Sequence, residues 1–343
     1  MAQGLRGYIA ERLHLGEMTV HHELAVIPLL ASTDDGPDYI TLGEAFAAGG
    51  FAVVEVNESG SVPNLKVVNG TARNVLILDG EELAGAKQNR VLNTTILVPA
   101  GESRIIPVSC TEQGRWHYAS AGFSESGHMM SCSIRSRKNL AVEASVRRHR
   151  SFVSDQREVW NDITALHRSH GTLSETGAMK DAFDARRRSM EAYLTGCPLQ
   201  ERQCGSAVLI KGSVAGIEFV SRPEAYRRLH EKLLGSYVMD IPMARAGESG
   251  PSEGKVRRIM ERIMESAEER FPSVGLGEDC RYTAAGLVGS ALAIDRWYLH
   301  TAFFRSERSR RDSDHERMSS MNRRRGYRSR SGSEAGCDNP AVQ

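Results

Sequence analysis

The sequence predicts an α+β fold in which an antiparallel, sandwich-like first half packs against a second half of helices and hairpins. In the first third of the chain, short apolar runs alternate with turn residues, a pattern typical of antiparallel strands. After residue 136, apolar residues recur at intervals of three and four, as on one face of a helix. These changes divide the chain into an N-terminal extension (1–21), a β-rich subdomain (22–135), an α+β subdomain packed on it (136–304) and a tail (305–343).

Each strand of the first half is expected from a short apolar run that ends at turn residues. The expected strands are His22–Leu30, Phe51–Val56, Leu65–Val68, Val75–Leu78, Thr94–Val98 and Arg104–Val108. Asn69-Gly70-Thr71 predicts a hairpin between the third and fourth of them, and Pro99–Glu102 predicts a turn between the last two. A helix is expected over Thr41–Ala48, because Thr41 and Glu44 have the spacing of a capping box.

The second half alternates predicted helices with predicted hairpins. Two apolar stripes indicate helices, one with Phe152, Val159, Trp160, Ile163 and Leu166, the other with Met179, Phe183, Met190 and Leu194. A further helix is expected after Ser221, which forms a capping-box pattern with Glu224, and another over Val256–Met264. The expected hairpins are Ala207–Lys211 with Ile217–Val220 and Leu287–Ile294 with Trp297–Phe304, and Ala244–Gly254 is expected to be a loop.

The composition is that of a soluble, folded, cytoplasmic protein. Hydrophobic residues make up 40% of the chain, and the net charge of +1 gives no overall attraction to nucleic acid or membrane. The N-terminus lacks the apolar core of a signal peptide, and Leu24–Ala31 is far shorter than the ~20 residues of a membrane helix. Six cysteines without a CxxC pair, and histidines without zinc-ligand spacing, predict reduced thiols and no metal site.

The tail from Arg305 onward is rich in arginine and serine and has almost no apolar residues. Such a segment buries too little surface to offset its conformational entropy, so we expect it to be disordered. Its arginines permit a weak, salt-sensitive contact with nucleic acid. Acidic residues between them dilute the positive charge, so we expect a solvated tail and no other nucleic-acid contact.

The densest polar stretch of the chain runs from Asp79 to Arg90, with Asn93 just beyond it. It combines carboxylates, a lysine, an arginine and amides with two glycines that permit close backbone approach. A second polar segment, Cys110–Trp116, follows the next pair of expected strands. If those strands fold back as an antiparallel pair, both segments lie at one end of the sheet.

These segments supply the candidate site residues. Lys87 and Arg90 are suited to binding phosphate or carboxylate. Glu81, Glu82 and Glu112 are candidate catalytic residues, as general bases or as oxygen ligands of a hard cation. The other candidate ligand-binding residues are Asp79, Gln88, Asn89, Asn93, Arg115, Trp116, Glu278 and Asp279, which offer carboxylates, amides, a further cation and an aromatic ring. The alternative is a polar turn whose ions pair with each other and whose amides satisfy backbone groups.

Several stretches together form a recognisable pattern. They are Asp79–Arg90 with Asn93, Pro107–Cys110 with Glu112, Gly114 and Trp116, Asp155-Gln156 with Val159-Trp160, Thr176–Met179, Leu234–Tyr237, Ser273–Asp279, Gly289–Leu292 and His300. The pattern resembles the domain family named for its association with ADP-ribosylglycohydrolases and rhodanese-phosphatases, over roughly His22 to Phe304. The resemblance implies a link to ADP-ribose or NAD metabolism by association alone, and it assigns no reaction and no catalytic residue. The turn at Asp295-Arg296 and the tail depart from the pattern.

Two functions remain open, and they differ in whether the protein is an enzyme. One is the binding or processing of a small anionic molecule that carries phosphate and ribose, such as ADP-ribose or an NAD derivative. The other is a non-catalytic scaffold that binds a ligand or a protein. The sequence names no cofactor and no oligomeric state.

Overall fold

The computed structural model describes residues 4–57, 60–241 and 250–306, which contain eight helices and 18 strands. The helices are α1 (Leu5–Arg12), α2 (Leu42–Ala48), α3 (Cys132–His149), α4 (Gln156–His170), α5 (Met179–Ala185), α6 (Arg187–Gly196), α7 (Pro223–Val238) and α8 (Glu253–Met264). The strands of the first half are β1 (Leu13–Leu15), β2 (Thr19–His21), β3 (Leu24–Ala31), β4 (Ile40–Thr41), β5 (Phe51–Glu55), β6 (Asn64–Asn69), β7 (Val75–Ile77), β8 (Glu81–Gly85), β9 (Arg90–Leu92), β10 (Ile96–Val98), β11 (Ser103–Cys110) and β12 (Phe123–Met129). Those of the second half are β13 (Gln203–Ile210), β14 (Ser213–Val220), β15 (Ala267–Pro272), β16 (Glu278–Ala284), β17 (Leu287–Ile294) and β18 (Trp297–Arg305). The predicted α+β class is confirmed.

The largest sheet has nine antiparallel strands drawn from both halves of the chain. Its order is β1-β3-β13-β14-β18-β17-β16-β15, and β2 also pairs with β3. The two hairpins expected in the second half are confirmed as β13–β14 and β17–β18. Because β3 pairs with β13, this sheet crosses the expected boundary at residue 135, and the division into two subdomains stays a prediction.

The second large sheet has the order β12-β8-β9-β11-β6-β5 and curls like a barrel. Its two end strands, β5 and β12, contact each other. At Gly122, just before β12, an added Cβ would lie 3.1 Å from the Val53 carbonyl oxygen, so glycine permits this close approach. Apolar residues of these strands, of the three-stranded sheet β10-β7-β4 and of α2 share one core.

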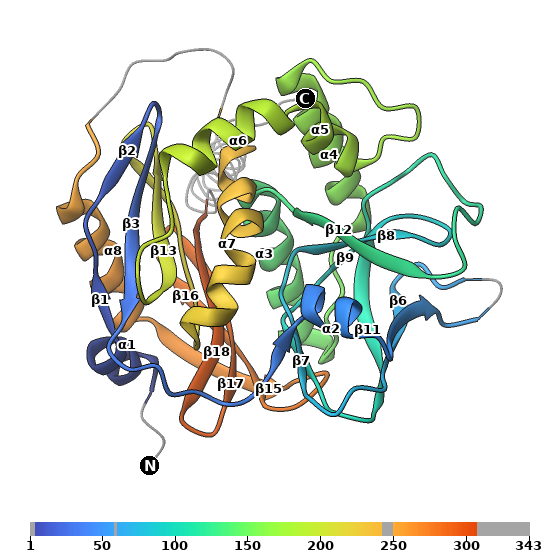
Figure 1. The fold of residues 1–343 in the computed structure, drawn as a ribbon, viewed down its shortest axis with the longest axis horizontal. Helices are drawn as coiled ribbons and strands as arrows, with labels where there is room; N and C mark the ends of the chain where they lie inside the picture. The colour runs from blue at the N-terminus through green and yellow to red at the C-terminus, as the bar shows by residue number, and fades with distance from the viewer. Residues whose placement is uncertain (1–3, 58–59, 242–249, 307–343) are drawn as a thin grey trace, which may run out of the picture. The chain divides into compact units, whose positions relative to one another are not determined.

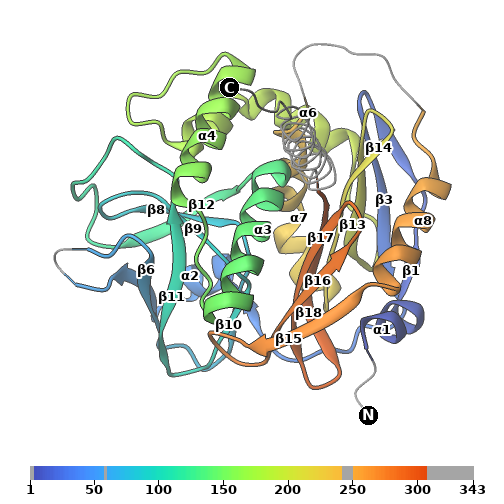
Figure 2. The same ribbon diagram turned by 180° about the vertical axis from the view of Figure 1, so that it is seen from behind.

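Helices α3 and α7 lie between the two large sheets (Figure 1). Helix α3 contacts β14, β17 and β18, and α7 contacts β13 on one side and β12 on the other. Helices α1 and α8 pack on the opposite face of the nine-stranded sheet (Figure 2). Strand alternation explains this arrangement, since Glu218 of β14 bonds to α3 while the adjacent Phe219 stacks on Tyr8 of α1.

The prediction of a hairpin around Asn69-Gly70-Thr71 is wrong. Strand β6 pairs with β5 and β11, whereas β7 pairs antiparallel with β10 and parallel with β4. The Asn69 amide explains the difference, because it donates to the carbonyl oxygens of Arg73 (2.9 Å) and Pro99 (2.9 Å). These bonds fix the connection as a crossing between two sheets rather than as a tight turn.

The helix boundaries confirm one predicted cap and correct two other features. The Thr41–Glu44 capping box is present at α2. Ser221 does not cap α7, which begins after Arg222, and its hydroxyl instead lies 2.9 Å from the Tyr39 hydroxyl. The stripe from Met179 to Leu194 belongs to two helices, α5 and α6, which are separated at Arg186.

Two predictions concern residues that lie largely outside the described part of the chain. Residues 244–249 of the expected loop and residues 307–343 of the expected disordered tail lie outside the described residues. Arg305, expected at the start of the tail, instead ends β18. Within the described ranges, no helix combines the length and the apolar character needed to cross a membrane.

Candidate functional site

Strand alternation distributes the predicted polar segment over several places in the fold. The segment includes β8 and β9, which pair with each other. Because successive side chains of a strand point to opposite faces, neighbours in sequence such as Glu81 and Glu82 meet different partners. The candidate residues therefore belong to separate groups of contacts.

Asp79 follows β7 and is held by α3. Lys138 donates a hydrogen bond to one carboxylate oxygen of Asp79, and Asn139 Nδ2 donates to the other at 3.0 Å. Lys138 also donates to the Leu92 carbonyl oxygen at 2.8 Å. Both oxygens of Asp79 are thus satisfied inside the protein, and the residue joins the polar segment to α3.

A second buried ion pair lies beside Asp79, between Arg135 of α3 and Glu218 of β14. Arg135 Nη1 donates to Glu218 Oε2 at 3.0 Å, and Arg135 Nε lies 3.8 Å from Asp79 Oδ2. His300 lies between Glu218 and Thr95, with distances of 2.9 Å from Nε2 to Glu218 Oε1 and 2.7 Å from Nδ1 to Thr95 Oγ1. Burial alone would raise the pKa of Glu218, but Arg135 and the His300 hydrogen bond outweigh it and lower the pKa to about 2.

Asp279 of β16 belongs to the same network. Arg281 donates to both of its carboxylate oxygens, from Nη2 at 2.8 Å and from Nε at 2.5 Å, and the Thr94 hydroxyl donates at 2.6 Å. Arg281 Nη1 also donates to Asn139 Oδ1 at 2.7 Å, which connects the pair to α3. Three carboxylates and three cations are therefore matched in the buried network: Asp79, Glu218 and Asp279 with Arg135, Lys138 and Arg281.

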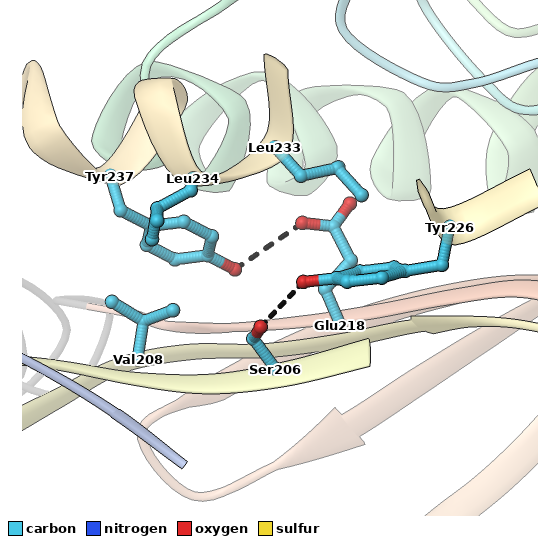
Figure 3. Close-up of a pocket in the computed structure, with 7 residues that line it drawn as sticks. All are labelled: Ser206, Val208, Glu218, Tyr226, Leu233, Leu234 and Tyr237. Atoms are coloured by element: carbon cyan, nitrogen blue, oxygen red, sulfur yellow. Dashed lines mark hydrogen bonds between the residues drawn. The ribbon is translucent and has the colours of Figure 1, made fainter. Parts of the chain in front are cut away.

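A small enclosed cavity lies beside Glu218, between α7 and strands β13 and β14 (Figure 3). The Tyr237 hydroxyl donates to Glu218 at 3.3 Å, and the hydroxyls of Tyr226 and Ser206 lie 2.5 Å apart. The cavity volume is about 10 Å³, which is room for one water molecule. A metabolite does not fit there, so we assign the cavity to the core.

Glu81, at the start of β8, is engaged in an ion cluster. Lys232 of α7 donates to Glu81 and also to Glu125 of β12. The Leu78 amide donates to the second Glu81 oxygen at 2.7 Å. Burial would lower the pKa of Lys232, but the two carboxylates outweigh it and raise the pKa.

Glu82 is fully buried on the other face of β8. The Thr111 hydroxyl donates to its Oε1 at 2.7 Å, whereas Oε2 has no hydrogen-bond partner among the residues that the structure describes. Burial raises the pKa of Glu82 to about 7, against the lowering influence of Thr111, Ser126 and Lys180. A carboxyl group with this pKa can gain or lose a proton near neutral pH.

Glu112 forms a bidentate ion pair with Arg115. Arg115 Nε donates to Glu112 Oε1 at 2.9 Å, and Nη2 donates to Oε2 at 2.6 Å. The Thr176 hydroxyl and the backbone N–H of Asn89 donate to the same carboxylate. Burial would raise the pKa of Glu112, but these hydrogen bonds outweigh it and hold the pKa below its ordinary value.

Two further candidates lie apart from these groups. The Asn93 amide donates to the Phe152 carbonyl oxygen at 3.0 Å, and its oxygen accepts from the Ser109 hydroxyl at 2.7 Å. The Glu278 side chain is 51% exposed and pairs with Arg270 at 2.7 Å. The side chains of both residues are therefore bonded to other groups of the protein.

Lys87, Gln88, Arg90 and Trp116 come together at the end of the barrel-like sheet that lies away from α2. Arg90 Nη1 donates to Gln88 Oε1 at 2.9 Å. The centre of the Trp116 ring lies 5.7 Å from the guanidinium carbon of Arg90 and 5.5 Å from Lys87 Nζ. Both cations are buried, whereas Trp116 is 47% exposed. The structure thus places two cations beneath an accessible aromatic ring.

Two residues that the sequence analysis did not select complete this group. Tyr118 is 50% exposed, and its ring centre lies 5.1 Å from Lys87 Nζ. Glu55 ends β5, and its Oε1 lies 4.0 Å from Arg90 Nη2. Its signal in the sequence is a carboxylate that continues the alternating buried positions of an apolar strand. We call the following residues the barrel-mouth group: Glu55, Lys87, Gln88, Arg90, Trp116 and Tyr118.

Two further features of the described chain have no connection with the candidate residues. An open hollow of about 530 Å³ lies between the end of α3 and the start of α4, and none of the predicted site residues lines it. No group of three or more histidine, cysteine, aspartate or glutamate side chains in the described ranges is arranged to hold a metal ion.

Comparison with known proteins gives one match. No curated protein and no solved structure matches the chain. The model of one family, the ARG and Rhodanese-Phosphatase-superfamily-associated Protein domain, matches residues 12–304. The match covers most of the chain and agrees with the resemblance carried by its motifs. The chain therefore belongs to the ARG and Rhodanese-Phosphatase-superfamily-associated Protein domain family.

Proposed function

We propose that the barrel-mouth group binds a small anionic molecule that carries a ring, of the ADP-ribose or NAD class. Lys87 and Arg90 would neutralise its phosphates, and Trp116 and Tyr118 would stack on its ring. The mouth of a β-barrel is a common place for a ligand site. The family name supports the ligand class through its association with ADP-ribosylglycohydrolases.

One observation carries this proposal. Arg90 has no exposed surface, yet its Nε and Nη2 have no hydrogen-bond partner among the described residues. Leaving a buried charged donor without a partner costs more than leaving a neutral one, about 1–3 kcal/mol or above. A bound phosphate would supply the acceptors that Arg90 lacks, through the bidentate geometry that guanidinium favours.

The same geometry favours binding over catalysis. Glu81 is engaged by Lys232, and Glu112 is closed into a pair with Arg115. Glu82 lies on the other side of β8 from the core residue Leu83 and has no exposed surface. We therefore propose a ligand-binding module, in which these carboxylates position the strands around the barrel mouth.

Removal of the Trp116 ring or of the Arg90 guanidinium is expected to weaken ADP-ribose binding. Trp116→Ala should lower the affinity at least about fivefold, because stacking of a base on an aromatic ring contributes about 1–3 kcal/mol. Arg90→Gln should lower it by a similar factor, because the phosphate loses a charge-assisted hydrogen bond. Isothermal titration calorimetry on the full chain measures both.

Arg104→Gln is the matched control, since Arg104 lies on β11 of the same sheet and pairs with Glu102 at the surface. It should leave the affinity within about twofold. Trp116 is half exposed, so its replacement tests the site even if Arg90→Gln does not fold. A folded wild-type protein that binds neither ADP-ribose nor NAD would contradict the proposal.

The second candidate function is a protein-binding scaffold. Apolar side chains of the β5–β6–β11 region are exposed, with Val62 at 42% and Ile105 at 48%. Exposed apolar side chains can belong to a protein interface. This reading predicts that Trp116→Ala leaves ADP-ribose binding and thermal stability unchanged, which differential scanning fluorimetry would show.

A further inference from the structure

We infer that Glu55 determines ligand specificity at the barrel mouth, by selecting a phosphate ester that also carries hydroxyl groups. This inference rests on the proposed function and goes beyond it, because it assigns a requirement for hydrogen-bond donors on the ligand. It starts from a pair of opposite charges that face each other without bonding.

Glu55 and Arg90 form an open pair. Their closest approach, from Arg90 Nη2 to Glu55 Oε1, is 4.0 Å, which is too long for a hydrogen bond. Both carboxylate oxygens of Glu55 are buried and have no hydrogen-bond partner in the described part of the chain. The side chains of Glu55 and Arg90 are only 4% and 0% exposed, so bulk solvent does not satisfy them.

Other buried ion pairs of this protein are joined by hydrogen bonds. Arg115 binds Glu112 through two hydrogen bonds of 2.9 and 2.6 Å, and Arg281 binds Asp279 in the same two-bond manner. The open geometry of Glu55 and Arg90 is therefore a local feature and not a general property of buried ion pairs in this protein. Their strands hold the two groups at a separation that leaves the polar atoms of both unused.

The unused atoms define complementary chemistry. Arg90 offers N–H donors and needs acceptors, whereas Glu55 offers two acceptor oxygens and needs donors. A fully deprotonated phosphate supplies acceptors alone, and its negative charge is repelled by Glu55. A sugar phosphate supplies both, since its phosphate can bind Arg90 while its hydroxyls donate to Glu55.

The test compares two probes in wild type and in Glu55→Gln. ADP-ribose carries phosphates and hydroxyls, whereas pyrophosphate carries phosphates alone. Glu55→Gln keeps the shape of the side chain but removes its negative charge. We expect the affinity for ADP-ribose to fall about tenfold, which corresponds to about 1.4 kcal/mol, while the affinity for pyrophosphate rises several-fold because the repulsion is gone.

Opposite changes in the affinities for ADP-ribose and pyrophosphate would distinguish a role of Glu55 in specificity from a structural role. If the two affinities change in the same direction, or if the affinity for ADP-ribose does not change, Glu55 is satisfied by the fold or by water and the inference is wrong. If wild type binds neither probe, the proposed function fails and the inference fails with it. Glu102→Gln, which removes a surface carboxylate beside β11, should change neither affinity.

A second variant covers the case in which Glu55→Gln does not fold. Glu55→Asp keeps the charge but withdraws the carboxylate by one methylene group. The affinity for ADP-ribose should then fall, while the affinity for pyrophosphate stays within about twofold. A pyrophosphate affinity that falls as much as that for ADP-ribose would overturn the inference.

Discussion

Replacement of Glu218 by alanine is expected to lower the free energy of unfolding by about 3–5 kcal/mol, a large share of the roughly 5–15 kcal/mol typical of folded domains. The variant leaves three buried cations against two carboxylates, removes the hydrogen-bonded partner of Arg135 and removes one of the two hydrogen-bond partners of His300. Arg135 has no exposed surface, so bulk solvent does not replace the lost carboxylate. Urea denaturation at pH 7, followed by circular dichroism, measures the change.

Glu224→Ala is the control for this prediction. Glu224 is 51% exposed and pairs at 3.2 Å with Arg228, which is 56% exposed, so its loss should cost less than about 1 kcal/mol. Replacing Arg135 and Glu218 together by Met and Leu should recover part of the loss, because no uncompensated charge of that pair then remains. If Glu218→Ala costs no more than Glu224→Ala, the buried Arg135–Glu218 pair contributes no more to stability than a surface ion pair.

The buried network also explains which parts of the fold the sequence could predict. Helix α7 was predicted, and its apolar residues pack in the core. Helix α3 was not predicted as an element, although it lies between the two large sheets. Its buried residues include Arg135, Lys138, Asn139 and Glu143, which interrupt the apolar positions of the helix. Hydrophobic periodicity cannot detect a helix whose core-facing side chains are charged.

The candidate site also shows what the sequence pattern could not predict, here in the β-rich half of the chain. The polar segment was expected between two strands, but it itself forms β8 and the start of β9. The pairing of these strands decides which side chains meet. Glu81 and Glu82 are neighbours in sequence, yet they contact Lys232 and Thr111 on opposite faces of β8. Glu55 was missed for the converse reason, because it reaches Arg90 from a separate strand. Contacts of this kind depend on strand order, which spacing along the chain does not contain.

Glu82→Gln is expected to become progressively more stable than wild type as the pH rises from about 4.5 to 7. Burial raises the pKa of Glu82 to about 7 in the folded protein, whereas the ordinary value of 4.5 applies when the chain is unfolded. Below pH 4.5 the carboxyl group is protonated in both states, so its contribution to stability is fully present. As the pH rises, the unfolded state loses the proton first and is favoured, so wild type loses about 3 kcal/mol before the curve levels off above pH 7.

The prediction depends on the surroundings of Glu82, where hydroxyls of Thr111 and Ser126 and the charges of Lys180 and Glu112 act on a side chain with no exposed surface. Glutamine keeps the hydrogen bond from Thr111 but has no proton to lose, so the variant lacks this pH dependence. Urea denaturation of both proteins at intervals between pH 4.5 and 8 measures the difference, and a surface variant such as Glu253→Gln should keep the wild-type profile. A constant difference between Glu82→Gln and wild type across this range would mean that Glu82 is ionised in the fold, with a cation or water beside Oε2.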